Sequence, residues 1–367
     1  MVDDERRNDV EDELRRQAKK SFDTGMTAFH RGDYSEALSA LDDALELCQD
    51  ISGSECGQAD CLHGSGIVLG EMGDLRGALG CYEQALVLYR EVPGNECGQA
   101  DCLYNIGVAL GGLGDSRGAL KCYERALILF QGVPDSGRAQ AECLFNRGAM
   151  LNELGDWRGA LGCFERSLTL FQGVPGSERE QADCLYGSGA TLSELGDYWE
   201  ALGYFGRALV LLGKGVVEAD RVEAERTGAC CLQGIGNCLI ELNEAVFPDH
   251  FARALDVFRR PEHVDHTKAD QASCLRSIGN GRSATGDLNG AVEAYQQAQD
   301  LYRQVGHPER ATEINVPLAR VLKRKAVAID SIFERLALLE ESLNLTIEAA
   351  LSLDRARFRL ERLDDRQ

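Results

Sequence analysis

The sequence predicts an all-α protein built from one helical hairpin repeated along the chain. The first observation is that the dipeptide Gly-Asp recurs, five times at a spacing of 41 residues. A glycine suits the left-handed residue that ends a helix, and an aspartate accepts the free N–H groups that begin the next. The dipeptide therefore marks a joint between two helices. Its copies are Gly32-Asp33, Gly73-Asp74, Gly114-Asp115, Gly155-Asp156, Gly196-Asp197 and Gly286-Asp287.

The second observation is that apolar residues follow helical spacing on both sides of each joint. In the third copy, residues 100–130, one apolar face precedes Gly114-Asp115 and another follows it. The first face contains Leu103, Ile106, Leu110 and Leu113, and the second contains Leu120, Tyr123, Ala126 and Leu127. Each copy is therefore expected to form two amphipathic helices.

The third observation is a set of matching positions that alternate small and large residues. A glycine in mid-helix costs about 1 kcal/mol relative to alanine, so its repeated use predicts close approach of the partner helix. The first helices carry Gly25, Gly66, Gly107, Gly148, Gly189, Gly236 and Gly279. The second helices carry Ala37, Ala78, Ala119, Ala160, Ala201, Ala254 and Ala291, followed four residues later by Leu41, Tyr82, Tyr123, Phe164, Phe205, Phe258 and Tyr295.

These matching positions resemble the tetratricopeptide repeat (TPR) family over about residues 14 to 305. The resemblance implies a right-handed α-solenoid of about seven hairpins, whose first helices line a concave groove. The period of 41 is longer than the usual ~34. In this respect the array is similar to the long-repeat subclass of kinesin light chains, Pins-type adaptors and bacterial regulator arrays. The bulky aromatic residue of the family near the start of the first helix is replaced by Leu62, Leu103, Leu144 and Leu185.

The solenoid is expected to have two flanking regions and one irregular copy. Residues 1–13 form a charged N-terminal tail, and residues 306–367 form a capping helix and a long amphipathic helix. In the sixth copy, Gly236 follows Gly189 by 47 residues, and the turn 243–251 is expected to hold about six extra residues. Two interpretations remain open: a hinge near 214–262, or a tolerated insertion in a surface turn, which is the simpler one.

The C-terminal region is expected to contain a capping helix at 309–325 and one long helix at 326–360. The long helix carries a heptad pattern, so it either packs back onto the solenoid, which we favour, or forms a dimeric coiled coil. The heptad positions are Ile329, Ile332, Leu336, Leu339, Leu343, Ala350 and Leu353, with Thr346 as the exception.

The composition excludes several classes of function. The net charge of -21 argues against nucleic-acid or anionic-membrane partners. No stretch has the ~20 apolar residues of a membrane span, and the charged N-terminus does not resemble a signal peptide, so we expect a cytoplasmic protein. Cysteines occupy matching positions in successive copies, which predicts buried packing rather than disulfides or metal binding. They are Cys61, Cys102, Cys143 and Cys184 in one set and Cys81, Cys122 and Cys163 in another.

No catalytic constellation, metal site or cofactor motif is visible, so the protein is not expected to be an enzyme and its function should lie in the groove. The helical phase places aromatic and acidic residues on the groove side of the first helices. These residues either stabilise the helices and their packing or bind a ligand. The candidate peptide-binding residues are Asp60, His63, Asp101, Tyr104, Glu142, Phe145, Asp183 and Tyr186.

The preferred interpretation is a non-catalytic scaffold or adaptor. Its ligand would be a peptide or helix with apolar anchors and basic flanks. The alternative is the regulatory or sensor subunit of a signalling or effector system, switched by a change of superhelix pitch. Self-association through the C-terminal helix is a third possibility.

Overall fold

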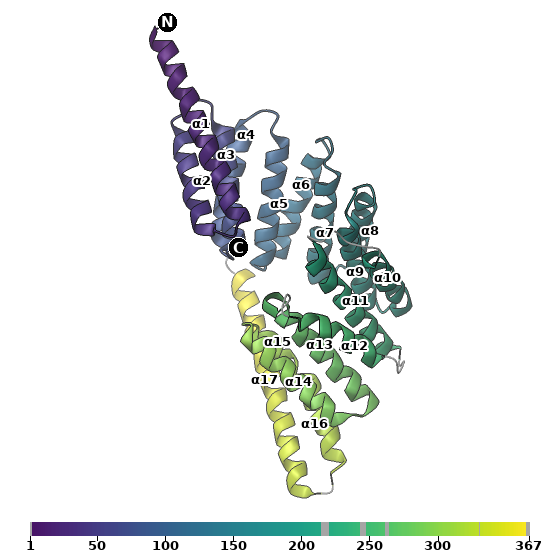
Figure 1. The fold of residues 1–367 in the computed structure, drawn as a ribbon. Coiled ribbons are helices and arrows are strands. Elements are labelled where there is room, and N and C mark those ends of the chain that lie inside the picture. The colour runs from purple at the N-terminus through teal and green to yellow at the C-terminus, as the bar shows by residue number, and fades with distance from the viewer. Residues whose placement is uncertain (1, 214–219, 243–246, 261–263, 330, 365–367) are drawn as a thin grey trace. The chain divides into compact units, whose positions relative to one another are not determined.

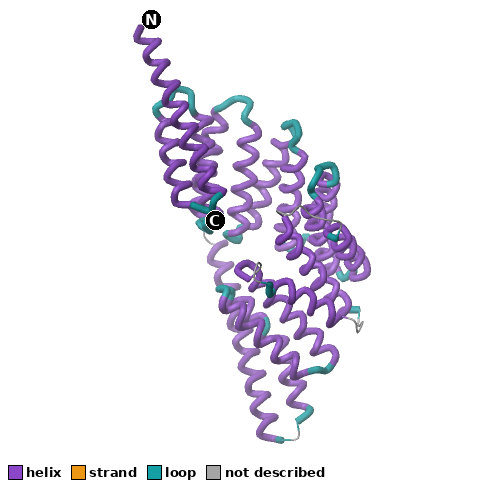
Figure 2. The backbone as a smooth tube through the Cα atoms, in the orientation of Figure 1, coloured by secondary structure: helices purple, strands orange, loops and turns teal. Residues whose placement is uncertain are grey.

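The computed structural model describes residues 2–213, 220–242, 247–260, 264–329 and 331–364, and every regular element in these ranges is a helix (Figure 2). The all-α fold class is therefore confirmed. By its contacts the chain divides into two compact units, 1–177 and 178–367.

Consecutive helices pair into seven hairpins (Figure 1). Unit 1 contains α1 (Val2–His30) with α2 (Tyr34–Gln49), α3 (Glu55–Glu71) with α4 (Leu75–Glu91), α5 (Glu96–Gly112) with α6 (Ser116–Phe130), and α7 (Gly137–Glu153) with α8 (Trp157–Phe171). Unit 2 contains α9 (Glu178–Leu195) with α10 (Tyr198–Leu212), α11 (Arg221–Glu241) with α12 (Phe247–Phe258), and α13 (Val264–Thr285) with α14 (Leu288–Gln304). Residues 2–13 of the charged N-terminal segment form the beginning of α1.

The Gly-Asp joints have the geometry that the sequence predicts. Gly114 has a φ of 86°, in the left-handed region that favours glycine, and the Asp115 side chain accepts a hydrogen bond from the Gly118 N–H at 2.8 Å. The other five glycines of the dipeptide also have positive φ. Asp197 differs from the other aspartates, because its side chain makes no capping hydrogen bond.

The mid-helix glycines lie directly against large side chains of the partner helix. A Cβ atom added to Gly107 would lie 2.6 Å from Cε1 of Tyr123, which is closer than real Cβ contacts allow. Gly66 stands in the same relation to Tyr82, and Gly148 to Phe164. The predicted pairing of a glycine with a large side chain thus packs these hairpins together.

The sixth hairpin differs from its predicted register. Gly236 packs against Phe251, with a Cβ contact of 2.7 Å, and not against Phe258. The segment 247–251, predicted to belong to an enlarged turn, is the beginning of α12. Phe258 lies two helical turns later and is fully buried. The predicted partner of Gly236, Phe258, is therefore wrong by seven residues. Residues 214–219, 243–246 and 261–263 of the proposed hinge lie outside the described part of the chain.

The C-terminal region contains α15 (Pro308–Glu313), α16 (Asn315–Val327) and α17 (Ile332–Asp364). The predicted long helix begins later than expected, because the helical segment that includes 326 and 327 belongs to α16 and Ile329 precedes α17.

Helix α17 packs back onto α16, but it does so with a different row of side chains than the heptad predicts. The packed row contains Leu338, Leu345 and the buried Ala349, and the Ser342 hydroxyl donates to the Ala319 carbonyl at 2.9 Å. The heptad positions Ile332, Leu336, Leu339, Leu343 and Ala350 are exposed.

The first set of repeated cysteines is buried, as predicted. Cys102, Cys143 and Cys184 are 0% exposed, and Cys61 is 2% exposed. Burial raises the pKa of the Cys102 and Cys143 thiols to about 12. In the second set, Cys163 is buried while Cys81 and Cys122 are half-buried.

Candidate functional site

The repeat period places the predicted site residues on successive first helices. Unit 1 holds Asp60 and His63 on α3, Asp101 and Tyr104 on α5, and Glu142 and Phe145 on α7. Unit 2 holds Asp183 and Tyr186 on α9. The six residues of unit 1 recur at the same helical phase, and we call their surface the groove face of unit 1.

The ring of each site residue packs against a ring of the partner helix in its own hairpin. The ring centroids of Tyr104 and Tyr123 are 6.0 Å apart, and those of Phe145 and Phe164 are 5.5 Å apart with an edge-to-face arrangement. His63 and Tyr186 make the corresponding contacts, at 5.6 Å and 5.9 Å. All four rings are half-buried. They therefore belong to the hairpin core on one side and remain accessible on the other.

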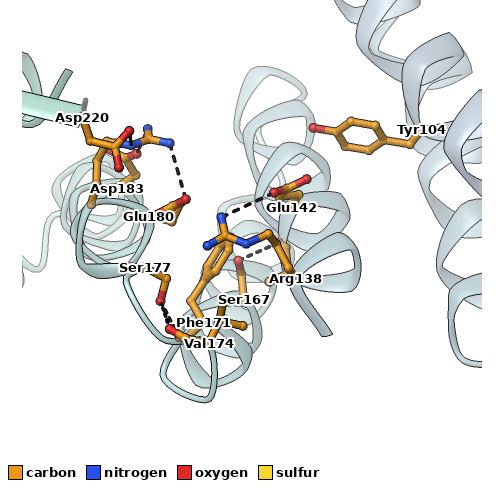
Figure 3. Close-up of polar contacts among 12 residues, drawn as sticks. Tyr104, Arg138, Glu142, Ser167, Phe171, Val174, Ser177, Glu180, Asp183 and Asp220 are labelled. Carbon is orange, nitrogen blue, oxygen red and sulfur yellow. Dashed lines mark hydrogen bonds and ion pairs between the residues drawn. The ribbon is translucent and has the colours of Figure 1, made fainter. Parts of the chain in front are cut away.

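Two of these rings are also tied to the next first helix. The Asn105 side-chain amide donates to Nε2 of His63 at 2.7 Å, and the Asn146 amide donates to the Tyr104 hydroxyl at 3.0 Å. Figure 3 shows Tyr104 reaching from α5 towards α7. Sequence reasoning missed this role, although the spacing of 42 residues between each asparagine and its ring partner was a usable signal.

Asp60 and Asp101 carry the uncompensated negative charge of the groove face of unit 1. Asp60 is exposed and accepts a hydrogen bond from the Tyr89 hydroxyl at 2.5 Å. Asp101 is half-buried, and its Oδ2 lies 3.7 Å from the Cys97 sulfur. Within the described ranges neither carboxylate forms an ion pair with a lysine or arginine. Both charges are therefore available to a ligand.

Glu142 and Asp183 differ from these two because each faces an arginine of its own helix. Glu142 Oε1 lies 4.0 Å from Arg138 (Figure 3), and Asp183 Oδ2 lies 3.0 Å from Arg179. Asp183 also accepts a hydrogen bond from Thr227 at 2.6 Å. The predicted row of four equivalent carboxylates is therefore uneven, with less free charge at Glu142 and Asp183.

Burial changes the protonation equilibria of the groove face. It lowers the pKa of His63, and the neighbouring Asp101 and Asp60 carboxylates only partly oppose this effect. Burial also raises the pKa of Asp101, against the opposing influence of His63. His63 is thus disposed to be a neutral ring at pH 7, which suits apolar or hydrogen-bonding contact rather than charge attraction.

A hollow of about 390 Å³ opens at the α1 end of the groove face, and its lining includes the Phe22 ring, Ile51 and Asp60. Phe22 occupies the position in α1 that corresponds to His63 in α3. Arg15 and Lys19 also line the hollow, so its lining holds basic side chains as well as Asp60. This hollow provides space for an apolar anchor next to a carboxylate.

The repeated arrangement of the groove face agrees with the family that the sequence matches. The sequence matches the profile of the tetratricopeptide repeat over residues 23–91, 62–132 and 137–212. These matches cover slightly more than half of the chain, and the chain belongs to the tetratricopeptide repeat family. Repeat modules of this family are typically non-catalytic. A search among curated proteins gives no match.

Solved structures share the fold at low sequence identity. The apo form of the quorum sensor NprR from B. thuringiensis is similar with a TM-score of 0.64 and 16% identity, covering 92% of this chain and 87% of the other. The apo form of RapI gives 0.63 and 17%, covering 78% and 98%. A tetratricopeptide repeat protein from Parabacteroides merdae ATCC 43184 gives 0.55 and 16%, covering 84% and 99%. No helix among the described residues is long and apolar enough to cross a membrane.

Proposed function

We propose that this protein is a non-catalytic adaptor whose groove face binds a segment of another protein. The segment would carry apolar anchors next to lysine or arginine side chains. The rings of His63, Tyr104 and Phe145 would contact the anchors, while Asp60 and Asp101 would attract the basic flanks. In unit 2, Tyr186 would offer a corresponding ring, while Asp183 is already paired with Arg179 and Thr227.

One observation supports this proposal above the others. In unit 1, successive first helices bring half-buried rings into a row beside two carboxylates that have no cationic partner in the described ranges. Half-buried rings held by asparagine contacts lose little conformational freedom on binding. The chain also carries a net charge of -21, which favours encounter with basic partners.

Photo-crosslinking tests this assignment while the partner is still unidentified. Val108 lies one helical turn after Tyr104 and is 44% exposed, so a photoreactive residue placed there would face the ligand. Met72, at the end of α3 and 53% exposed, is the matched control position. In native extract, we expect adducts to form from the photoreactive residue at Val108 and not from the one at Met72. Asp101→Asn should reduce the adducts formed from Val108. Equal labelling from both positions would refute the groove face as the binding site.

A regulatory or sensor subunit is the second candidate. It is favoured by the similarity in fold to the quorum sensor NprR over 92% of this chain, at an identity that shows the fold alone. Such a subunit would change conformation when its segment binds. Small-angle scattering of the full chain with and without the captured segment separates the two candidates, because an adaptor would keep one scattering profile and a sensor would not.

Self-association through α17 is a third element of the proposal, and it rests on the exposed apolar row of that helix. Leu336 and Leu343 are both 59% exposed, and Ile332 is 64% exposed. This row has coiled-coil spacing, and the opposite face of α17 is already covered by α16. A second copy of the same row is self-complementary about a twofold axis. Light scattering should therefore detect a dimer that Leu336→Glu and Leu343→Glu dissociate; a monomer at all concentrations would exclude it.

A further inference from the structure

A second cavity lies in unit 1 between α6 and α8, away from the predicted site residues. It has a volume of about 400 Å³, within the size range of ligand pockets. Its apolar lining comes from Leu127, Leu144 and Leu170, together with Ile128, which is 64% exposed. None of the predicted groove residues lines it. We call it the α6–α8 pocket.

Two arginines also line the α6–α8 pocket. Arg147 extends from α7 and Arg166 from α8, and both influence the same buried thiol. Burial raises the pKa of Cys163, while the positive charges of Arg147 and Arg166 act in the opposite direction. Glu124 is the single acidic residue of the lining.

Arg147 is a departure from the repeat pattern. Its position, directly before the mid-helix glycine, holds an uncharged residue in every other hairpin, and in three of them that residue is buried. The equivalents are Thr24, Ser65, Ile106, Ser188, Ile235 and Ile278. Ser65 is 7% exposed, Ile106 is 5% exposed and Ser188 is 0% exposed. A half-buried guanidinium therefore stands where three of the other hairpins bury an uncharged side chain.

The charge of this arginine is not balanced by an ion pair. Neither Arg147 nor Arg166 has a carboxylate within 4.0 Å in the part of the chain that the structure describes. Removing a charged group from water without a counter-ion is unfavourable. For folding alone, a serine or isoleucine at position 147 would therefore cost less free energy than the arginine does. An unpaired guanidinium at a core position is explained by a ligand that brings the opposite charge.

We propose that the α6–α8 pocket binds an acidic segment of a partner protein, with one carboxylate placed between Arg147 and Arg166. The two guanidinium groups and Glu124 together leave one positive charge, which matches a single carboxylate better than a phosphate dianion. Ile128 and Leu170 provide the surface for an apolar residue next to that carboxylate. The pocket is thus opposite in charge preference to the groove face, which selects basic flanks.

The test uses the full chain and an array of ten-residue peptides. Each peptide carries one Glu or Asp beside Leu or Ile in a Ser/Gly background, and each has a twin in which Gln or Asn replaces the acid. The variants are Arg147→Ser, which installs the residue of two other repeats, and Arg166→Gln. Arg158→Gln is the matched control, because Arg158 is exposed on α8 but does not line the pocket.

We expect the wild type to bind acidic peptides in preference to their amide twins. Arg147→Ser and Arg166→Gln should weaken this binding tenfold or more, while Arg158→Gln and the groove variant Asp101→Asn leave it unchanged. Arg147→Ser should unfold at a denaturant concentration equal to or higher than the wild type, since the arginine is not needed for folding. The proposal is overturned if binding does not depend on the peptide carboxylate, if Arg147→Ser binds as the wild type does, or if it loses stability. If inorganic phosphate stabilises the chain against the denaturant while no peptide binds, the proposal is also overturned, because the pocket is then a site for small anions.

Discussion

The close contact between Gly107 and Tyr123 predicts how the repeat responds to one added methyl group. In Gly107→Ala, the new Cβ would lie 2.6 Å from Cε1 and 2.9 Å from Cδ1 of the Tyr123 ring. Tyr123 is 2% exposed, so its ring has little room to retreat. Overpacking of this kind costs about 1–3 kcal/mol, and the higher helix propensity of alanine returns about 1 kcal/mol. The net effect is a loss of roughly 0–2 kcal/mol.

Gly80→Ala is the matched control for this substitution. Gly80 lies in α4, and a Cβ atom there would meet no atom within 4 Å, so only the gain in helix propensity remains. The two variants should therefore differ in stability by about 1–3 kcal/mol, with the propensity contribution cancelled. Urea unfolding followed by circular dichroism measures the difference through the transition midpoints, which is suitable because repeat arrays can depart from two-state unfolding.

Relief of the contact provides a second readout. Tyr123→Leu removes the ring, so the cost of Gly107→Ala should shrink when the two substitutions are combined. Equal midpoints for Gly107→Ala and Gly80→Ala, or costs that simply add in the double variant, would show that the repeat does not depend on close packing of glycine against the ring.

Further predictions concern caps, thiols and carboxylates. Asp115→Ala should cost about 1 kcal/mol by loss of its capping hydrogen bond, and Asp197→Ala, which removes no such bond, should cost clearly less in the same urea unfolding assay. Cys102 and Cys143 should react slowly with a thiol reagent in the native state, and replacement of either by alanine should cost about 1 kcal/mol; rapid native labelling would contradict their burial. Because burial raises the pKa of Asp101, its ionisation disfavours the folded state as pH rises. Asp101→Asn should therefore be more stable than the wild type at pH 7, with the difference shrinking as pH falls towards 3.8, the ordinary pKa of the carboxyl, and levelling off below it; a constant difference across pH would refute this.

The hairpin architecture could be predicted because each joint and each close contact is a local signal. Gly114 and Asp115 encode the end of one helix and the start of the next, and Gly107 with Tyr123 encodes the packing between them. The register of the sixth hairpin could not be predicted, because Phe251 and Phe258 are both large residues on the buried side of α12. A pattern of small and large residues alone does not show which of them faces Gly236.

The site could be predicted in part. Helical phase placed the rings and carboxylates on the first helices, and it also held a signal for which carboxylates are compensated. Arg138 and Arg179 stand four residues before Glu142 and Asp183, the spacing of a helical ion pair, whereas a cysteine holds that position before Asp60 and Asp101. The hydrogen bond of Asp183 with Thr227, which lies 44 residues away, could not be predicted. The heptad of α17 does form an apolar row, yet a sequence does not show which of two apolar faces a helix buries.

The most direct test of the groove face is the affinity of the segment captured at Val108 for the wild type and for Tyr104→Ala. If Tyr104 anchors the ligand, its replacement should weaken binding by about 1–3 kcal/mol, measured by calorimetry. Helicity must first be shown to persist, since Tyr104 also packs against Tyr123. An unchanged affinity with helicity retained would contradict the proposal that the first helices of unit 1 form the binding surface.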